Sequence, residues 1–530
     1  MIGVVSKPAE KEVIEEFFQL FKTPWEFYNP LHQHQYAVLL VAGETPPESD
    51  ASLIVIYASE KLPSDACDVA KQGLPETDAF AVWGNIQMPI YGRSVTFFNP
   101  DGAGFLLSNS ADILGFEKRN NSQRILRIGY DLFQEVSFLL TKGQPPKNAV
   151  IPTLDFHIAV LRCFITEYGI RLVEIPPVPA GYKFIACLTH DVDFIAIRRH
   201  FIDHSFLGFL YRATVGSVMD YFRDKTSLQN LKENLKAVFS LPLIFMKLCR
   251  DPWNQFDRYI EIEQGSPSTF FFIPFKNQPG EGFHEKRQKY RACKYDVDDV
   301  KDTIKMLLSH GCEVGVHGLD SWHSAEMGRQ ELNRIRQVTT DKIGIRMHWL
   351  CTNEHTFRLL DQAGYDYDST SGYNESIGFR AGTSQVYKPM GAEHLLELPM
   401  HIQDTALFSP GRMDMSKDHA EQLCDKIIDH VVRQMGVITL LWHQRSIGPE
   451  RLWGDFYSLL IKKLRGANCW FTTAQDAVDW FRIRRSVSFT PNEEVHISYH
   501  HTKNSAFPPL VLRTYQKPLE FCDKPIEICT

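Results

Sequence analysis

Short apolar runs alternate with amphipathic helical patterns from Gly181 onward, and this alternation constrains the fold more than any other feature of the chain. Consecutive parallel strands need a crossover of helical length, so the pattern predicts parallel β-α units. About seven such repeats favour closure into a barrel. We therefore predict an α/β protein with a distorted (β/α)7-type barrel. The predicted strands end near Asp191, Ile273, His317, Arg346, Pro399 and His443, with a late strand at Trp470–Phe471.

The Pro-rich segment Ile175–Pro179 is the expected linker before this barrel. Ahead of it, apolar runs at Ala37–Val41 and Leu53–Tyr57 and helical patterns over Gln123–Leu140 and Leu154–Tyr168 predict an α+β domain. Beyond the barrel, alternating apolar residues predict a short C-terminal β tail. Residues 1–178 are predicted to form an α+β domain of unassigned role. Residues 179–486 are predicted to form the barrel, and residues 487–530 a β appendage.

The composition disfavours several classes of function. The 530 residues carry 57 Lys and Arg against 64 Asp and Glu, a net charge of −7, so no overall basic field favours nucleic acid or an anionic membrane. The 11 cysteines include no CxxC pair, which is typical of reduced thiols in a reducing compartment. The first residues lack the basic-then-apolar pattern of a signal peptide, and Ala237–Cys249 is too short to span a bilayer. We expect a cytoplasmic protein with no transmembrane segment.

An insertion of about fifty residues, 199–255, separates the first two predicted strands of the barrel. Its pattern is helical and unusually apolar, with Phe, Leu and Ile at many positions. Packing into a core, against a partner or against a second copy of the chain is favoured over contact with a membrane.

Ionisable residues collect at the ends of the predicted strands, where side chains from different parallel strands converge on one face of a barrel. Asp191 and Asp193 lie two residues apart and point the same way if the strand continues. Two carboxylates that close raise the pKa of one of them unless a cation lies between them. Alone, the pair also fits turn residues after a strand. The residues that favour a site are His317, Arg346 with His348, and His443, all at other strand ends.

A second Asp-Val-Asp tripeptide, Asp296–Asp298, shows that the tripeptide alone is weak evidence for a site. It precedes an amphipathic pattern over Asp299–His310, where aspartates serve as the N-cap and in the first turn of a helix. This copy is interpreted as structural.

Six segments together resemble the motifs of the polysaccharide deacetylase family, the NodB-homology or carbohydrate esterase family 4 type. The resemblance covers roughly 181–485 and includes a segment common in deacetylase-like proteins of surface-polysaccharide loci. Its order is specific, although each motif alone is not. The segments are Thr189–Asp193 (THDVD), Glu313–Gly318 (EVGVHG), Gly344–Leu350 (GIRMHWL), Tyr365–Ser369 with Gly378–Thr383, Leu396–Pro399 (LELP) and Thr439–His443 (TLLWH).

The resemblance implies a divalent metal ion, most often Zn²⁺ and otherwise Co²⁺ or Ni²⁺, held by one Asp and two His. Asp193 and His317 match two of these ligands. The family spacing His-x-x-x-His points to position 321 for the third, but that residue is Ser321 and the next histidine is His323. We predict His323 as the third ligand. The substitutes are His348, Asp320 and His190.

The resemblance also implies roles in catalysis. Asp191 corresponds to the general base, Arg346 to the residue that holds this base, and His443 to the acid that protonates the leaving amine. His348, Trp349 and Arg380 are predicted to contact the substrate, although each also fits a packed structural position.

The function that follows is metal-dependent de-N-acetylation of an amino sugar in a bacterial surface polysaccharide, such as an exopolysaccharide, or in its precursor. One alternative is a hydrolase of another linear or cyclic amide on the same barrel, favoured by a small closed pocket. The other is a glycan-binding or assembly protein that has lost the metal, favoured if neither His323 nor His348 reaches the ion.

Overall fold

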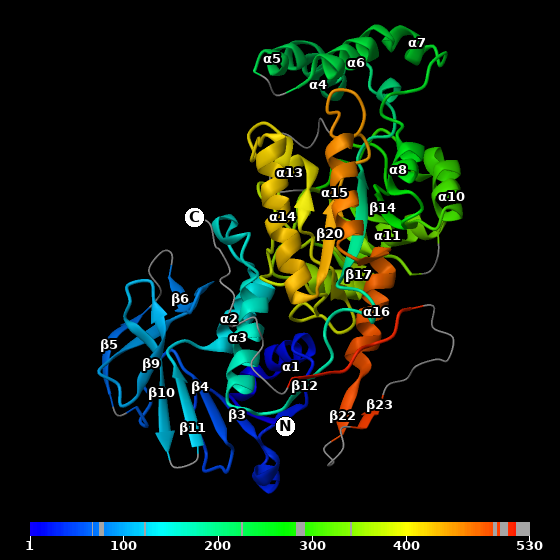
Figure 1. Cartoon of the computed structure of the whole chain (residues 1–530). Coiled ribbons are helices and arrows are strands. Elements are labelled where there is room, and N and C mark those ends of the chain that lie inside the picture. Colours follow the sequence, from blue (N-terminus) through cyan, green and yellow to red (C-terminus); the bar gives the residue numbers. More distant parts are fainter. Residues whose placement is uncertain are drawn as a thin grey trace. The chain divides into compact units, whose positions relative to one another are not determined.

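The computed structural model describes residues 1–65, 67–73, 79–120, 123–223, 226–281, 292–339, 342–490, 496–498 and 507–515 (Figure 1). The chain divides into two compact units. The first comprises Met1–Ala180, Arg380–Thr383 and the described residues from Phe481 on; the second comprises Gly181–Phe379 and Ser384–Trp480. The division into 1–178, 179–486 and 487–530 stays a prediction.

The first unit is built on an 11-stranded mixed sheet. Strands β1 to β4 and β11 pair in parallel, and β10, β9, β6 and β7 continue the sheet in antiparallel fashion, with β5 and β8 to one side. The predicted α+β character of this part is confirmed. The strands are β1 (Ile2–Val5), β2 (Trp25–Phe27), β3 (Val38–Ala42), β4 (Leu53–Tyr57), β5 (Asp68–Gly73), β6 (Phe80–Trp83), β7 (Ile86–Pro89), β8 (Ser94–Phe98), β9 (Ala103–Ser108), β10 (Ile113–Asn120) and β11 (Gln123–Ile128), and the helices are α1 (Lys11–Leu20), α2 (Leu132–Thr141) and α3 (Thr153–Glu167).

The predicted helix over Gln123–Leu140 is wrong in its first part. Residues Gln123–Ile128 form β11, which lies between β4 and β10. The helix α2 begins only at Leu132, where the Asp131 carboxylate accepts hydrogen bonds from two backbone N–H groups as its N-cap. The spacing of apolar residues in a short run fits both a helix and a strand. Here the run pairs with two neighbouring strands and is therefore a strand. The predicted helix Leu154–Tyr168 is confirmed as α3.

Two short β pairs complete the first unit toward the chain end. Strand β12 (Leu172–Glu174) pairs with β24 (Arg513–Tyr515), and β22 (Ser488–Thr490) pairs with β23 (His496–Ser498), both in antiparallel fashion.

The second unit contains a curled parallel sheet centred on β13, which is buried along its whole length. The strand order is β18-β17-β16-β15-β14-β13-β20-β19, with β21 also paired to β13, and all pairs are parallel. The strands are β13 (Phe184–Val192), β14 (Ser268–Phe272), β15 (Glu313–Gly318), β16 (Ile345–Met347), β17 (Tyr367–Asp368), β18 (Leu396–Glu397), β19 (Ile402–Gln403), β20 (Val437–Leu441) and β21 (Cys469–Thr472).

The chain itself closes this sheet. Strands β18 and β19 are consecutive and separated by only four residues; the first pairs with β17 and the second with β20. Between them, Leu398 donates a backbone hydrogen bond to Asp368 and His401 donates one to Thr439, at 2.8 and 3.1 Å. The predicted α/β fold with a distorted (β/α)7-type barrel is confirmed.

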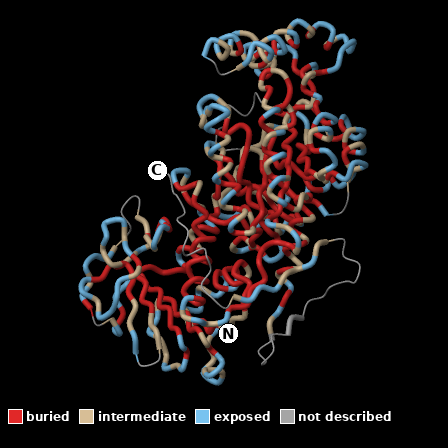
Figure 2. The backbone as a smooth tube through the Cα atoms, viewed as in Figure 1, coloured by how far each residue is buried: buried red, intermediate tan, exposed pale blue. Residues whose placement is uncertain are grey.

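Amphipathic helices surround the strands and bury them, as the red strands of Figure 2 show. Asp296 caps the turn that precedes α10 and forms a capping box with Asp299, so the second Asp-Val-Asp is structural as predicted. The helices are α8 (Phe256–Glu263), α10 (Lys301–Ser309), α11 (Ala325–Arg336), α12 (Thr356–Ala363), α13 (Asp404–Phe408), α14 (Lys417–Gln434), α15 (Gly454–Gly466) and α16 (Ala474–Ser486).

The insertion forms helices, as predicted, at the top of Figure 1. It has a small core of its own, in which Phe209, Ile244 and Trp253 are buried. No helix in the described part of the chain is long and apolar enough to cross a membrane. The elements are α4 (His204–Tyr211), a π-helical segment (Arg212–Gly216), α5 (Ser217–Phe222), α6 (Leu228–Phe239) and α7 (Leu241–Phe245).

Candidate active site

Three parallel strands and the segments that follow three strands bring the candidate residues together at the carboxyl end of the sheet. Asp191 lies near the end of β13, and Asp193 directly follows this strand. His317 is on β15 and Arg346 is on β16, opposite each other in the strand register. His348 follows β16, and His443 follows β20.

Asp191 and Arg346 form a buried ion pair. Nη1 of Arg346 lies 3.0 Å from Oδ1 of Asp191 and also donates to the Thr189 hydroxyl at 2.8 Å. The other guanidinium nitrogens donate to the carbonyl and hydroxyl of Ser369, and the guanidinium lies over the ring of Phe271. Because every nitrogen of this planar group has a partner, Arg346 fixes the position of the Asp191 carboxylate.

Asp193, His317 and His348 converge on one point. One ligand atom from each lies within 4.8 Å of the other two. Oδ1 of Asp193 is 3.3 Å from Nε2 of His317 and 3.7 Å from Nε2 of His348. This carboxylate oxygen is buried and makes no hydrogen bond of good geometry within the described residues. A carboxylate oxygen and two imidazole nitrogens arranged in this way could hold a metal ion.

The hydrogen bonding of His317 suits a metal ligand. Its Nδ1 lies 2.9 Å from the backbone carbonyl of Arg346, so the neutral ring carries its proton on Nδ1 and presents a lone pair at Nε2. Burial lowers the pKa of His348 to about 4, which leaves this imidazole neutral at neutral pH. Burial alone raises the pKa of Asp193, but the hydrogen bond with His317 and the neighbouring imidazoles hold this pKa well below its usual range.

His443 faces this group from another side, with Nε2 at 3.9 Å from Oδ2 of Asp193. Its Nδ1 lies 2.7 Å from Oδ1 of the buried Asp404, whose Oδ2 accepts the backbone N–H of His443. Burial opposes ionisation of Asp404, yet the charge and hydrogen bond of His443 lower its pKa to about 2. Asp404 is therefore an anion that orients the imidazole of His443.

The structure places His323 outside this group. Its Nε2 lies 3.5 Å from Asp320 and 3.7 Å from Glu281, so His348 and not His323 stands beside Asp193 and His317. His190, a further substitute, bonds to Glu263 and the carbonyl of Trp442 on the other face of β13.

The three residues predicted to contact substrate have different surroundings. His348 belongs to the metal-ligand group, and Trp349 follows it with its ring centroid 5.3 Å from that of His348. The backbone of Trp349 and Leu350 is left-handed, with φ of 61° and 53°, a strained conformation that often marks functional sites. Arg380 belongs to the first unit, where its carbonyl accepts the N–H of Gln144.

Two features of the site have only a weak signal in the sequence. Asp404 lies 39 residues before His443 and directly after a strand of two residues, so no motif joins the pair. The turn that follows His348 is left-handed at Trp349 and Leu350, and no glycine in the sequence announces it.

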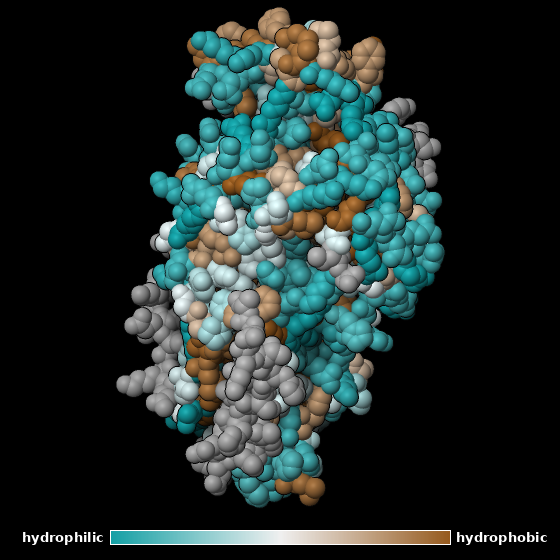
Figure 3. All heavy atoms as spheres, turned by 90° about the vertical axis from the view of Figure 1, so that its right-hand side faces the viewer, coloured by the Kyte–Doolittle hydropathy of each residue, from teal (hydrophilic) through white to brown (hydrophobic). Residues whose placement is uncertain are grey.

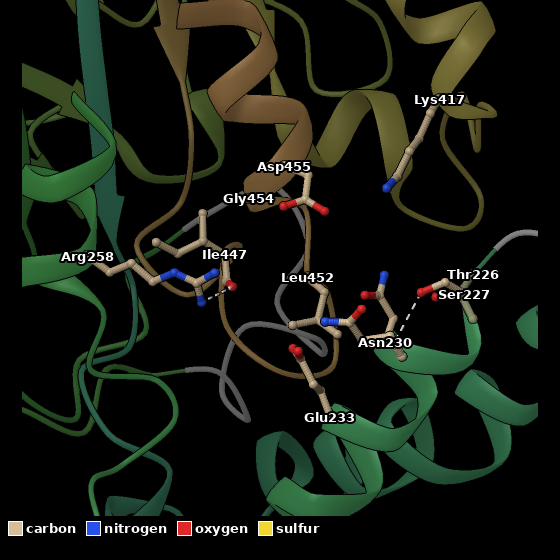
Figure 4. A pocket seen from close by; sticks show the side chains of 11 residues that line it. Thr226, Ser227, Asn230, Glu233, Arg258, Lys417, Ile447, Leu452, Gly454 and Asp455 are labelled. Atoms are coloured by element: carbon tan, nitrogen blue, oxygen red, sulfur yellow. Dashed lines mark hydrogen bonds between the residues drawn. The ribbon is translucent and has the colours of Figure 1, made fainter. Parts of the chain in front are cut away.

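A separate polar cavity of about 590 Å³ lies in the second unit between the insertion and the barrel (Figure 4). Side chains of both charges line it, from α6, α8, α14 and the start of α15. None of the candidate site residues lines it. The charged lining residues are Glu233, Arg258, Lys417 and Asp455.

No protein-family model and no curated protein matches the chain. Several solved structures are similar to it. A putative polysaccharide deacetylase from Mycobacterium smegmatis is 18% identical, and the match covers 58% of this chain and 95% of that one, with a TM-score of 0.35. PuuE allantoinase is 13% identical over 58% and 92% of the two chains (TM-score 0.34). Agd3, described as a novel carbohydrate deacetylase, is 8% identical over 92% and 87% (TM-score 0.35).

The chain is similar, over 58% of its length, to a structure described as a polysaccharide deacetylase, the family whose motifs its sequence resembles.

Proposed function

We propose that the chain is a metal-dependent hydrolase that removes the N-acetyl group from an amino sugar of a carbohydrate. The observation that carries this proposal is the convergence of Asp193, His317 and His348 between a held carboxylate, Asp191, and a held imidazole, His443. A base and an acid on two sides of a metal-ligand set are what hydrolysis of an amide requires.

The donor set fits a divalent ion such as Zn²⁺, for which one carboxylate and two imidazoles are common ligands. The unsatisfied oxygen of Asp193 and the lone pair of His317 supply two of these donors, and His348 supplies the third. A bound ion would contribute Lewis-acid chemistry, activating water and polarising the acyl oxygen. Co²⁺ or Ni²⁺ suits the same ligands.

The residues around this set would move the protons. Asp191 takes a proton from the water that adds to the acyl carbon, and Arg346 keeps the carboxylate in place as it does so. His443, held by Asp404, gives a proton to the nitrogen as the carbon–nitrogen bond breaks. Acetate and a free amino sugar leave. The side chains of Asp193, His348 and His443 are 20%, 15% and 15% exposed to solvent. A carbohydrate therefore has access to this end of the sheet.

A cyclic or small linear amide is the competing substrate, because the same groups would cleave its carbon–nitrogen bond. The sequence resemblance favours the sugar, and the partial exposure of three site residues supports an accessible site over a closed pocket. The surface-polysaccharide context and a cytoplasmic location stay predictions from the sequence.

The test is release of acetate from N-acetylglucosamine oligomers by the protein loaded with Zn²⁺ or Co²⁺. We expect Asp191→Asn to lower the rate about 10²- to 10⁴-fold while the metal stays bound. Asp298→Asn, in the second Asp-Val-Asp, is the matched control and should keep full activity. Release of ammonia from a small linear amide, or of a ring-opened half-amide from a cyclic imide, with no acetate from sugars, would select the competing substrate.

A further inference from the structure

We propose that the insertion is a membrane-interface surface whose exposed apolar side chains enter the headgroup region of an anionic phospholipid bilayer. In the described part of the chain, thirteen of the eighteen exposed large apolar side chains lie between Phe201 and Leu248. Figure 3 shows these apolar side chains gathered at the top of the molecule, over the elements α4 to α7. So dense an exposed cluster marks an interaction surface.

The first helical run of the insertion has two apolar faces. Helix α4, the π-helical segment and α5 are continuous from His204 to Phe222. One face buries Phe209 and Ala213 against Trp253 and neighbours. The other face is open, although the exposed side of a surface helix is ordinarily polar. Its members follow helical spacing and are 53%, 57%, 51%, 39% and 80% exposed: Leu207, Tyr211, Val215, Met219 and Phe222.

Cations flank the apolar side chains. Leu228, Lys232, Lys236 and Phe239 are all exposed and lie at helical spacing along one side of α6. After α7, exposed Lys247 accompanies Met246 and Leu248, and the exposed Arg250 pairs with Asp257. Within the described residues of 201–250, Glu233 is the only exposed acidic side chain.

This local charge opposes the charge of the whole protein. The sequence from Arg199 to Arg250 contains eight Lys or Arg and four Asp or Glu, whereas the net charge of the chain is −7. Lysine is depleted at protein–protein interfaces, whereas long basic side chains beside apolar ones are characteristic of helices that lie in a membrane interface. The combination therefore fits an anionic lipid surface better than a protein partner.

The insertion joins the barrel at the end that carries the candidate site. It starts six residues after Asp193, and Arg445, two residues after His443, lies over the rings of Phe194 and Trp253 at 4.3 and 5.1 Å. Arg212 of the insertion pairs with Glu450 in the same loop after β20. If the proposed function holds, this placement suits a substrate attached to lipid. The membrane binding itself does not depend on that function.

The test is flotation of the full chain with vesicles of phosphatidylcholine, with and without about one third phosphatidylglycerol. We expect binding to the anionic vesicles that weakens as salt rises. Phe222→Ser/Phe239→Ser should weaken it about tenfold or more, and Lys232→Glu/Lys236→Glu should remove the preference for anionic lipid. Leu31→Ser/Phe98→Ser, which changes exposed apolar residues of the first unit, is the matched control and should bind as wild type.

Absence of binding to either vesicle, or equal loss in the control, overturns the proposal. The proposal is also overturned if sedimentation velocity shows that the wild type is a dimer and that Phe222→Ser/Phe239→Ser is a monomer. A second copy of the chain would then cover the apolar face. Circular dichroism of each variant verifies folding, and acetate release measured without vesicles separates this result from the proposed function.

Discussion

Oδ1 of Asp404 lies 2.7 Å from Nδ1 of His443, and the other oxygen of the same carboxylate accepts the backbone N–H of His443. One buried anion thus fixes both the ring and the main chain of the proposed acid. The carboxylate sets which nitrogen of the imidazole faces the site.

Asp404→Asn is predicted to lower kcat about 10²-fold or more with little change in KM, because the amide keeps the shape of the carboxylate but loses its charge. Initial rates of acetate release across pH measure this effect. The metal content should stay at the wild-type level. An unchanged kcat would show that Asp404 serves the fold and not the acid.

The sequence predicted the barrel and most of the residues at its carboxyl end, because parallel strands place their ends on one face whatever the loops do. Asp191, Asp193, His317, Arg346 and His443 needed only strand positions to be predicted together. The roles assigned to them remain predictions. Their grouping in the structure is what supports those roles.

The other site residues and one helix boundary depend on local backbone geometry, which the spacing of residues in the sequence does not predict. His323 was predicted because it is the next histidine after position 321, whereas His348, which directly follows β16, lies beside Asp193 instead. Arg380 lies in a segment that belongs to the other unit. The run Gln123–Ile128 fits a helix by its period alone, and only the two strands beside it decide otherwise.

Arg346→Met is predicted to destabilise the protein by about 3–5 kcal/mol, because it leaves the buried Asp191 carboxylate without its charged partner. Arg346→Lys should destabilise the protein by a smaller amount, since an ammonium keeps the positive charge but cannot reproduce the contacts to both Asp191 and Ser369. Urea unfolding measures the change. Arg329→Met, which removes a surface pair with Glu326, is the control and should shift stability by no more than about 1 kcal/mol. Equal effects of the two Met variants would contradict the structural role of Arg346.

Glu331→Gln is predicted to change how stability depends on pH. This buried carboxylate accepts hydrogen bonds from the N–H groups of Leu319 and Asp320 and from the Ser321 hydroxyl. Burial raises its pKa from 4.5 to about 7, so the folded state binds more protons than the unfolded state between these values. The free energy of unfolding then falls as pH rises through this window, by at most about 3 kcal/mol from this group.

In Glu331→Gln that contribution should vanish, and the free energy of unfolding should fall less between pH 4.5 and 7 than in wild type. Urea titrations at a series of pH values measure the slope. Glu326→Gln, an exposed change on the same helix, should keep the wild-type fall. A slope in Glu331→Gln as steep as in wild type would show that another group causes the dependence.

Asp193, His317 and His348 are proposed to hold a divalent ion. Metal content after incubation with Zn²⁺ and desalting tests this proposal most directly, with wild type beside His348→Ala and the matched variant His323→Ala. We predict about one ion per chain in wild type and in His323→Ala, and loss of the ion in His348→Ala. Retention in His348→Ala with loss in His323→Ala, or no bound ion in wild type, would contradict the claim.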